Sequence, residues 1–318
     1  METASHPRGW KVLAAFAVIY LVWGSTFLAI RVGVREVPPF LLAAMRFLVA
    51  GFVLIAWMRG KGTALPSLRE WLSASVLAVP IFVLDYGLLF WAERRVPSGI
   101  AAVMLATIPV FMTLSEIVML RTQRLTPRLG AALLVGIGGV AVLVSRSVSF
   151  GDAPIDTLGA IALIVASISW SVASILTRKF PLPSEKAMSS GAQMLAGGVL
   201  LTFTAMGLGE FRGFYWQEVS LKAWLALAYL IVAGSIVAFT AYVWLIHHQS
   251  PTKVGTYAYV NPVVAVVIGY FFGGEVLNVR TILGTVLVLA SVVVITTMPT
   301  KKVDTVRRAK DVSEFAEL

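Results

Sequence analysis

Long apolar runs, separated by short polar or Pro- and Gly-rich interruptions, divide the chain into ten segments. Runs of about 20 apolar residues match a hydrocarbon core roughly 30 Å thick. The predicted spans cover residues 12–30, 40–58, 71–91, 98–119, 127–145, 157–177, 187–208, 221–246, 253–272 and 280–298. The pattern therefore predicts an all-α integral membrane protein with ten transmembrane helices.

Several residues of the first half recur in the second half in the same order, at shifts of 147 to 154 residues. The pairs, first half with second half, are Trp23 with Trp170, Arg31 with Arg178, Leu48 with Leu195, Gly51 with Gly198, Trp91 with Trp244, Pro97 with Pro251, Pro109 with Pro262 and Gly130 with Gly284. Because each half has an odd number of spans, the second half enters the membrane from the opposite side. This predicts two inverted five-helix repeats, residues 1–150 and 151–298, and a basic cytoplasmic tail, residues 299–318.

Composition and charge agree with a membrane protein. Charged residues make up 13% of the chain, against about 25% in soluble domains. The net charge of +10 lies in loops and the tail, so it does not indicate nucleic-acid binding. Lys and Arg concentrate on the side that holds both termini, which predicts a multi-pass protein of the inner cell membrane with both termini in the cytoplasm. The chain has no cysteine, which excludes disulfides and thiolate metal sites.

Prolines near the middle of the fourth and ninth spans predict two matched helix breaks. Pro109 and Pro262 would free the carbonyl groups of Leu105 and Ala258. In lipid, an unpaired carbonyl has to face protein or a water-filled cavity. A simple kink is the alternative, but the matched pair favours a binding site between the repeats.

Two opposite charges lie inside the apolar spans, at similar depth. Arg46 follows the outer start of the second span and Asp85 precedes the outer end of the third. Because a buried charge favours a partner, we expect them to approach each other. Gln193 occupies the position that matches Arg46 in the second repeat. Glu116, near the inner end of the fourth span, is expected to reach the membrane surface.

Aromatic and polar residues complete the predicted substrate site. Trp23, Trp170 and Tyr257 are candidates for cavity walls, although core packing is the commoner role of such residues. Ser174 belongs to a polar stripe on the sixth span, where small residues also serve close helix packing. Tyr257 and Asn261 correspond to apolar residues in the first repeat. The second repeat is therefore expected to supply most hydrogen bonds to a substrate.

These residues resemble the drug/metabolite transporter superfamily, and specifically its EamA-type ten-helix members. The resemblance rests on VWGSTFLAIRVGV at 22–34, AAMRFLVAG at 43–51, VPSGIAAVMLATIPVF at 96–111 and SPTKVGTYAYVNPVVAVVIGYFFGGE at 250–275. It implies transport of small metabolites, often export of amino acids or related compounds, while sugar, nucleotide-sugar and drug carriers belong to the same superfamily. One departure is that the Gly-Glu kept as Gly274-Glu275 appears as Thr122-Gln123 in the first half.

Other classes of function fit less well. Residues 250–253 match S-x-x-K, but no S-D-N or K-T-G follows, and there is no H-E-x-x-H, so neither an enzyme nor a metal or other cofactor is predicted. A channel is disfavoured by the inverted repeat, and an uptake carrier or sugar facilitator stays an alternative to an exporter. The expected partners are a small-molecule substrate and the lipid bilayer, with protons as the candidate coupling ion and no nucleic acid; the oligomeric state is not predicted.

Overall fold

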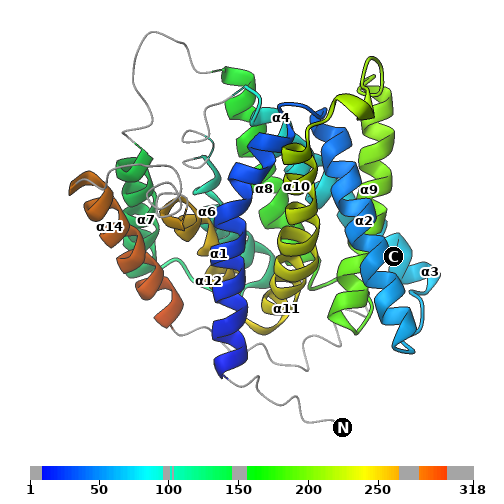
Figure 1. The fold of residues 1–318 in the computed structure, drawn as a ribbon. Helices are drawn as coiled ribbons and strands as arrows, with labels where there is room; N and C mark the ends of the chain where they lie inside the picture. The colour runs from blue at the N-terminus through cyan, green and yellow to red at the C-terminus, as the bar shows by residue number, and fades with distance from the viewer. Residues whose placement is uncertain (1–8, 96–100, 102–103, 145–155, 265–278, 299–318) are drawn as a thin grey trace.

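The computed structural model describes residues 9–95, 101, 104–144, 156–264 and 279–298. These residues form helices and no strand, which confirms the predicted all-α class. Figure 1 shows a bundle in which α1 lies beside α10 and α11, while α7 and α14 pair on one flank.

Helix is present in every one of the ten predicted spans. The first half comprises α1 (Gly9–Gly33), α2 (Pro39–Gly60), α3 (Leu68–Ala78), the π-helical η1 (Val79–Gly87), α4 (Leu88–Ala92), α6 (Ile108–Ser115), the π-helical η2 (Glu116–Leu120) and α7 (Pro127–Val144). The second half comprises α8 (Thr157–Leu176), α9 (Lys186–Gly207), the 3-10 helix η3 (Trp216–Glu218), α10 (Leu221–Tyr229), the π-helical η4 (Leu230–Phe239), α11 (Thr240–His248), α12 (Pro251–Val254) and α14 (Val279–Thr297). Residues 257–264 are also helical.

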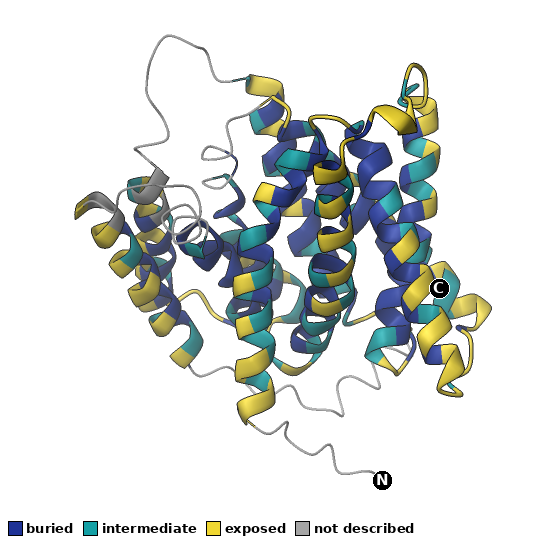
Figure 2. Ribbon diagram, in the orientation of Figure 1, coloured by how far each residue is buried: buried dark blue, intermediate teal, exposed yellow. Residues whose placement is uncertain are grey.

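Five helices of the described part are long and apolar enough to cross a membrane. They are Gly9–Gly33, Pro39–Gly60, Leu68–Ala92, Thr157–Leu176 and Leu221–His248. Large apolar side chains such as Leu13, Phe52 and Leu225 are more than half exposed and cover the outside of the bundle (Figure 2). Such a surface is rare on soluble monomers and suits contact with lipid.

The two repeats pack against each other in a reciprocal crossing of α2 and α9. A Cβ atom added to Gly51 would lie 2.5 Å from the backbone nitrogen of Leu195. A Cβ atom added to Gly198 would lie 2.7 Å from the backbone nitrogen of Leu48. Gly51 therefore contacts Leu195, and Gly198 contacts Leu48. The repeat pairs these two glycines with each other and these two leucines with each other, so the two contacts are equivalent. This contact has the two-fold character that an inverted repeat predicts.

The third span of each half contains a π-helical segment, η1 or η4, at a similar position. Each segment offers a backbone carbonyl to the first helix of the opposite repeat. Ser169 Oγ on α8 donates to the Pro80 carbonyl at 2.9 Å, and Trp23 Nε1 on α1 donates to the Gly234 carbonyl at 3.1 Å. π-helical turns often mark functional sites, and these two connect the repeats.

The helix interruptions differ from those predicted at the two prolines. In the fourth span the turn lies at residues 106–107, and Pro109 follows in the first turn of α6, where its missing N–H costs little. In the ninth span the turn lies at residues 255–256, whereas Pro262 lies within helical residues. A threonine hydroxyl binds the carbonyl three residues earlier at each turn, Thr107 to Met104 at 2.5 Å and Thr256 to Lys253 at 2.6 Å. Such bonds compete with the helical ladder.

Candidate functional site

A cavity of about 60 Å³ lies between the two repeats, with walls from both. It is lined by Trp23, Thr26, Phe27, Ile30, Arg46, Asp85, Tyr86, Leu89, Leu105 and Ile108 of the first repeat and by Trp170, Tyr257, Ala258, Asn261 and Pro262 of the second. At roughly 10–15 Å³ for one water, the cavity has room for only a few. It has to widen before a metabolite can enter.

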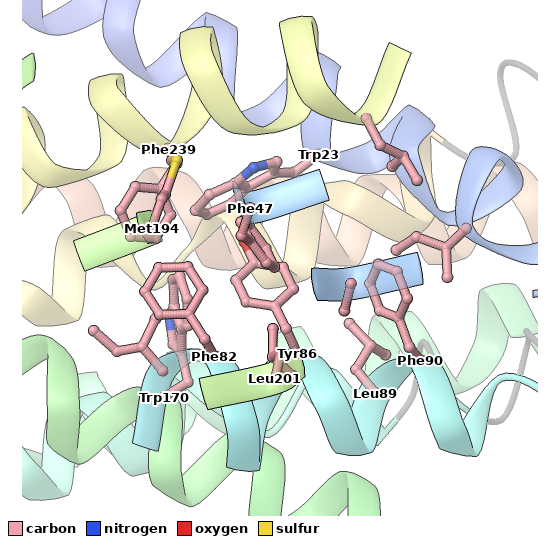
Figure 3. Close-up of a cluster of buried hydrophobic side chains, with 14 of the residues drawn as sticks. Trp23, Phe47, Phe82, Tyr86, Leu89, Phe90, Trp170, Met194, Leu201 and Phe239 are labelled. Carbon is pink, nitrogen blue, oxygen red and sulfur yellow. The ribbon is translucent and has the colours of Figure 1, made fainter. Parts of the chain in front are cut away.

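Four aromatic side chains, Trp23, Trp170, Tyr242 and Tyr257, form one packed cluster that we call the aromatic cluster. The ring centroid of Trp23 lies 5.6 Å from that of Trp170, 5.2 Å from that of Tyr242 and 4.8 Å from that of Tyr257. Figure 3 shows Trp23 and Trp170 among further buried rings, including Tyr86. The two tryptophans that correspond in the repeats thus meet edge to face beside the cavity.

Arg46 is buried in the wall of this cavity, with 1% of its surface exposed. Its Nε donates a hydrogen bond to Ser235 Oγ at 2.7 Å, while its Nη1 has no hydrogen-bond partner among the described residues. The rings of Phe47, Tyr86 and Phe90 surround the guanidinium carbon at 4.7, 5.0 and 6.0 Å from their centroids. These rings offset part of the cost of burying the charge.

Asp85 lines the same cavity but does not pair with Arg46. The two side chains, both among the described residues, form no ion pair and no hydrogen bond with each other. The predicted direct pair is therefore wrong for this conformation, because a serine and three rings hold the guanidinium instead. Asp85 lies within electrostatic range of the phenol groups of Tyr86, Tyr242 and Tyr257.

The second repeat contributes Tyr257 and Asn261 to the wall, next to Pro262. Asn261 is 5% exposed, and its Oδ1 has no hydrogen-bond partner among the described residues. A buried amide oxygen without a donor is costly. A ligand that donates a hydrogen bond would remove this cost.

Three residues predicted for the site do not line the cavity. Ser174 does not line the cavity but shares a short hydrogen bond with the hydroxyl of Tyr242 in the aromatic cluster. Gln193 is fully buried on α9, where its Nε2 donates to Ser189 Oγ at 3.2 Å. Pro109 is next to the lining residue Ile108 but does not reach the cavity.

Sequence reasoning missed two residues that shape the site, Tyr86 and Ser235. Tyr86 lines the cavity and contacts the Arg46 guanidinium. Its signal was its place directly after Asp85, in a span already marked by an inward charge. Ser235 gives no such signal, because a lone serine in an apolar run usually serves helix packing.

Comparison with known proteins identifies the kind of protein to which this cavity belongs. A model described as the EamA-like transporter family matches residues 10–145 and again residues 157–297. The chain belongs to the EamA-like transporter family. The EamA-like chain is 37% identical over 288 residues to the uncharacterized inner membrane transporter YedA of Escherichia coli strain K12, with 90% of each chain covered.

More distant relatives agree with this assignment. The EamA-like chain is 25% identical to Protein PecM of Dickeya dadantii strain 3937, over 86% of this chain and 88% of that one. A solved crystal structure, 24% identical, matches with a TM-score of 0.72 over 92% of this chain and 98% of that chain, which shows the fold alone. The protein is a multi-pass membrane transporter, and the resemblance noted from the sequence is confirmed.

Carboxylates of this EamA-like protein connect the repeats at the end of the bundle predicted to face outward. Glu36 accepts hydrogen bonds from Ser220 N at 2.7 Å and Ser220 Oγ at 2.8 Å, at the start of α10. These bonds lower the pKa of Glu36. Glu210 accepts one from Leu41 N at 2.8 Å, at the start of α2, and its burial raises its pKa despite that bond. Each repeat thus caps a helix of the other.

A third carboxylate, Glu116, makes the same kind of contact at the opposite end. It is 1% exposed and accepts hydrogen bonds from Thr252 N at 2.9 Å, Thr252 Oγ1 at 2.7 Å and Thr122 Oγ1 at 2.8 Å. The expectation that Glu116 reaches the membrane surface is therefore wrong. Its oxygens are instead fixed at the N-terminus of α12, where they connect the repeats at the end of the bundle predicted to face inward.

Proposed function

We propose that this transporter binds a small metabolite, an amino acid or a related compound, in the cavity between its repeats and exports it by alternating access. The single observation that carries this proposal is the composition of the cavity wall. Aromatic faces alternate there with buried polar side chains, notably Asp85 and Asn261, and Asn261 Oδ1 has no hydrogen-bond partner among the described residues. A ligand with an apolar body and polar ends satisfies both kinds of wall.

The small volume of the cavity supports a closed conformation of the transport cycle. Ligand pockets typically measure about 300–1,000 Å³, several times the volume found here. Rocking of one repeat against the other would widen the cavity toward one face at a time. The carboxylate contacts at Glu36, Glu210 and Glu116 lie at the two ends, where such rocking has to break them in turn.

The proposal is tested by measuring ligand binding and flux with the full chain. Thermal unfolding of purified protein is screened against amino acids, sugars and cationic drugs, where a ligand at 100 times its Kd adds about 2.7 kcal/mol of stability. The hits are then assayed for flux in proteoliposomes of known orientation. Amino acid efflux supports the proposal. Flux only in the uptake direction, or of sugars alone, contradicts it.

Asp85→Asn is the first variant to compare with the wild type. It keeps the size of the side chain but removes the charge that would face an amine of the substrate. We expect the apparent affinity for an amine-bearing substrate to fall by about ten- to a hundredfold. The matched control is Glu218→Gln on the exposed helix η3. Equal affinities in wild type and D85N would exclude a role for Asp85 in binding.

Coupling to protons is the further part of the proposal, and it rests on Asp85 as the buried acid of the cavity. An intramembrane carboxyl is a common carrier of protons in transporters. Flux is measured with and without a pH gradient across the liposome. A gradient should accelerate the wild type and leave D85N unchanged. Identical wild-type rates in both conditions would remove proton coupling.

A further inference from the structure

Arg46 is a fully buried cation whose partners do not balance its charge. Its Nε binds the neutral Ser235 hydroxyl at 2.7 Å, and its Nη1 has no hydrogen-bond partner among the described residues. The nearby rings are neutral, and Asp85 on the same cavity forms no ion pair with it. A guanidinium kept from water without an anion is energetically costly. A charged group buried at such a cost inside a membrane protein is a candidate binding group.

The second repeat positions this guanidinium. A Cβ atom added to Gly234 would lie 2.9 Å from Arg46 Nη2 and 3.1 Å from Thr26 Cγ2, so a larger residue there would displace the guanidinium. The next residue, Ser235, accepts the Nε hydrogen bond. Both belong to η4, and Trp23 Nε1 fixes the Gly234 carbonyl at 3.1 Å. The guanidinium of Arg46 is therefore held through Nε by Ser235 and contacts Tyr86, while its Nη1 has no hydrogen-bond partner among the described residues.

The positive charge of Arg46 has no counterpart in the second repeat. Gln193 matches Arg46 in the second repeat, but its amide bonds to Ser189 on its own helix. Among the described lining residues, Arg46 is the one basic side chain and belongs to the first repeat, while Tyr257 and Asn261 belong to the second. A ligand with a single anionic group would be oriented by this asymmetry.

We propose that Arg46 recognises an anionic group of the transported metabolite, a carboxylate or a group of similar size, and that Ser235 and Gly234 position it for this. This inference rests on the proposed function in that it uses the same cavity. Nη1 becomes reachable when the cavity widens for the ligand. A carboxylate can accept from the guanidinium in a bidentate manner, so the anion fixes one end of the metabolite.

The test compares acids with the matching amides, in which an uncharged carboxamide of nearly the same shape replaces the carboxylate. Thermal unfolding of the full chain in lipid nanodiscs is titrated with L-leucine and L-leucinamide, L-phenylalanine and L-phenylalaninamide, acetate and acetamide, and inorganic phosphate. In the wild type, the acid of at least one pair should bind about tenfold more tightly than its amide. Arg46→Gln should abolish this preference. Ser235→Ala should reduce it by about threefold or more, because the charge stays but its position is no longer fixed.

The matched control is Arg95→Gln, which removes an arginine that pairs with Asp156 at 3.4 Å and is 45% exposed. This variant should keep the wild-type preference for acids. Without ligand, R46Q should unfold no earlier than the wild type, since it removes a buried charge. If R46Q does not fold, the charge has a structural counterion and the proposal fails unless S235A shows the reduced preference for acids.

The remaining outcomes separate this inference from the proposed function. No acid–amide difference in any wild-type pair, or a difference kept in R46Q, would overturn the inference. Binding of phosphate without any carboxylate would assign the site to a free inorganic anion and overturn it as well. Flux that is unchanged in R46Q removes the anion subsite but leaves transport intact. Acid binding through Arg46 without flux removes transport but leaves the subsite.

Discussion

At the scale of single residues, burial decides which acids of this protein can respond to pH. Glu93, just beyond the third span, is 6% exposed, and neither carboxylate oxygen has a hydrogen-bond partner among the described residues. Burial raises its pKa to about 7, although the charge of Arg31 opposes the shift. Glu36, which accepts two hydrogen bonds from Ser220, has instead a lowered pKa. At the same end of the bundle, the pKa of Glu93 is therefore shifted upward and that of Glu36 downward.

We expect Glu93 to make the protein less stable as pH rises. Its pKa is near 4.3 when unfolded and about 7 when folded, so the folded state holds the proton more tightly. Stability is then highest below pH 4.3 and falls as pH rises to about 7, by on the order of 3 kcal/mol in total. Glu93→Gln should flatten this part of the profile of unfolding midpoint against pH. An identical slope in wild type and E93Q would show that Glu93 ionises without cost.

The sequence could predict residues whose type is unusual in lipid, but not those whose role depends on direction. Trp23 and Trp170 were found through the repeat, and Arg46 and Asp85 through their charge, and all four line the cavity. Their partners depend on how helices rotate and cross, which periodicity in an almost wholly apolar span does not fix. Ser235, common in type, was therefore missed.

At the scale of helices, the fourth and ninth spans are each divided into short helices, and their junctions are held by side-chain hydrogen bonds. Thr256 Oγ1 binds the Lys253 carbonyl and pairs with the Tyr20 hydroxyl of α1 at 2.7 Å. The sequence predicted that these spans would be broken, because both contain proline. The sequence could not place the turns, because a proline does not have to lie at the break itself. Pro109 lies in the first turn of the helix after the turn, and Pro262 lies within helical residues.

Glu116→Ala should loosen the junction between α6 and α12. Three donors of Thr252 and Thr122 would lose their acceptor, which costs about 1–3 kcal/mol for each group that stays buried without water. We expect a lower unfolding midpoint and faster hydrogen exchange of the Thr252 amide. The control is Glu185→Ala at the exposed start of α9, whose side chain makes no capping bond. Unchanged exchange at Thr252 in E116A would mean that this contact does not hold the junction.

At the scale of the whole molecule, two inverted repeats are connected through the crossing of α2 and α9. The matched residues of the two halves predicted this architecture. The reciprocal contacts of Gly51 with Leu195 and of Gly198 with Leu48 give it a physical form. The domain boundaries at residues 150 and 298 stay a prediction.

Gly51→Ala and Gly198→Ala should each destabilise the protein. The added methyl group would lie 2.5 or 2.7 Å from a backbone atom of the facing helix, so the helices have to separate. Overpacking of this kind typically costs about 1–3 kcal/mol. Gly138→Ala on α7 is the matched control, because nothing lies within 4 Å of its added Cβ. It should stabilise the helix by about 0.5–1 kcal/mol. Equal unfolding midpoints of all three variants would contradict a tight crossing.

The reciprocal character of that crossing has a thermodynamic consequence for transport. If the inward- and outward-facing states arise when the two repeats exchange conformations, a contact that maps onto itself has the same energy in both states. The glycine–leucine crossing then strengthens the fold without favouring either state. A contact without a counterpart acts differently. The bond of Arg46 to Ser235 has no equivalent at Gln193, so its energy differs between the two states and shifts their relative populations.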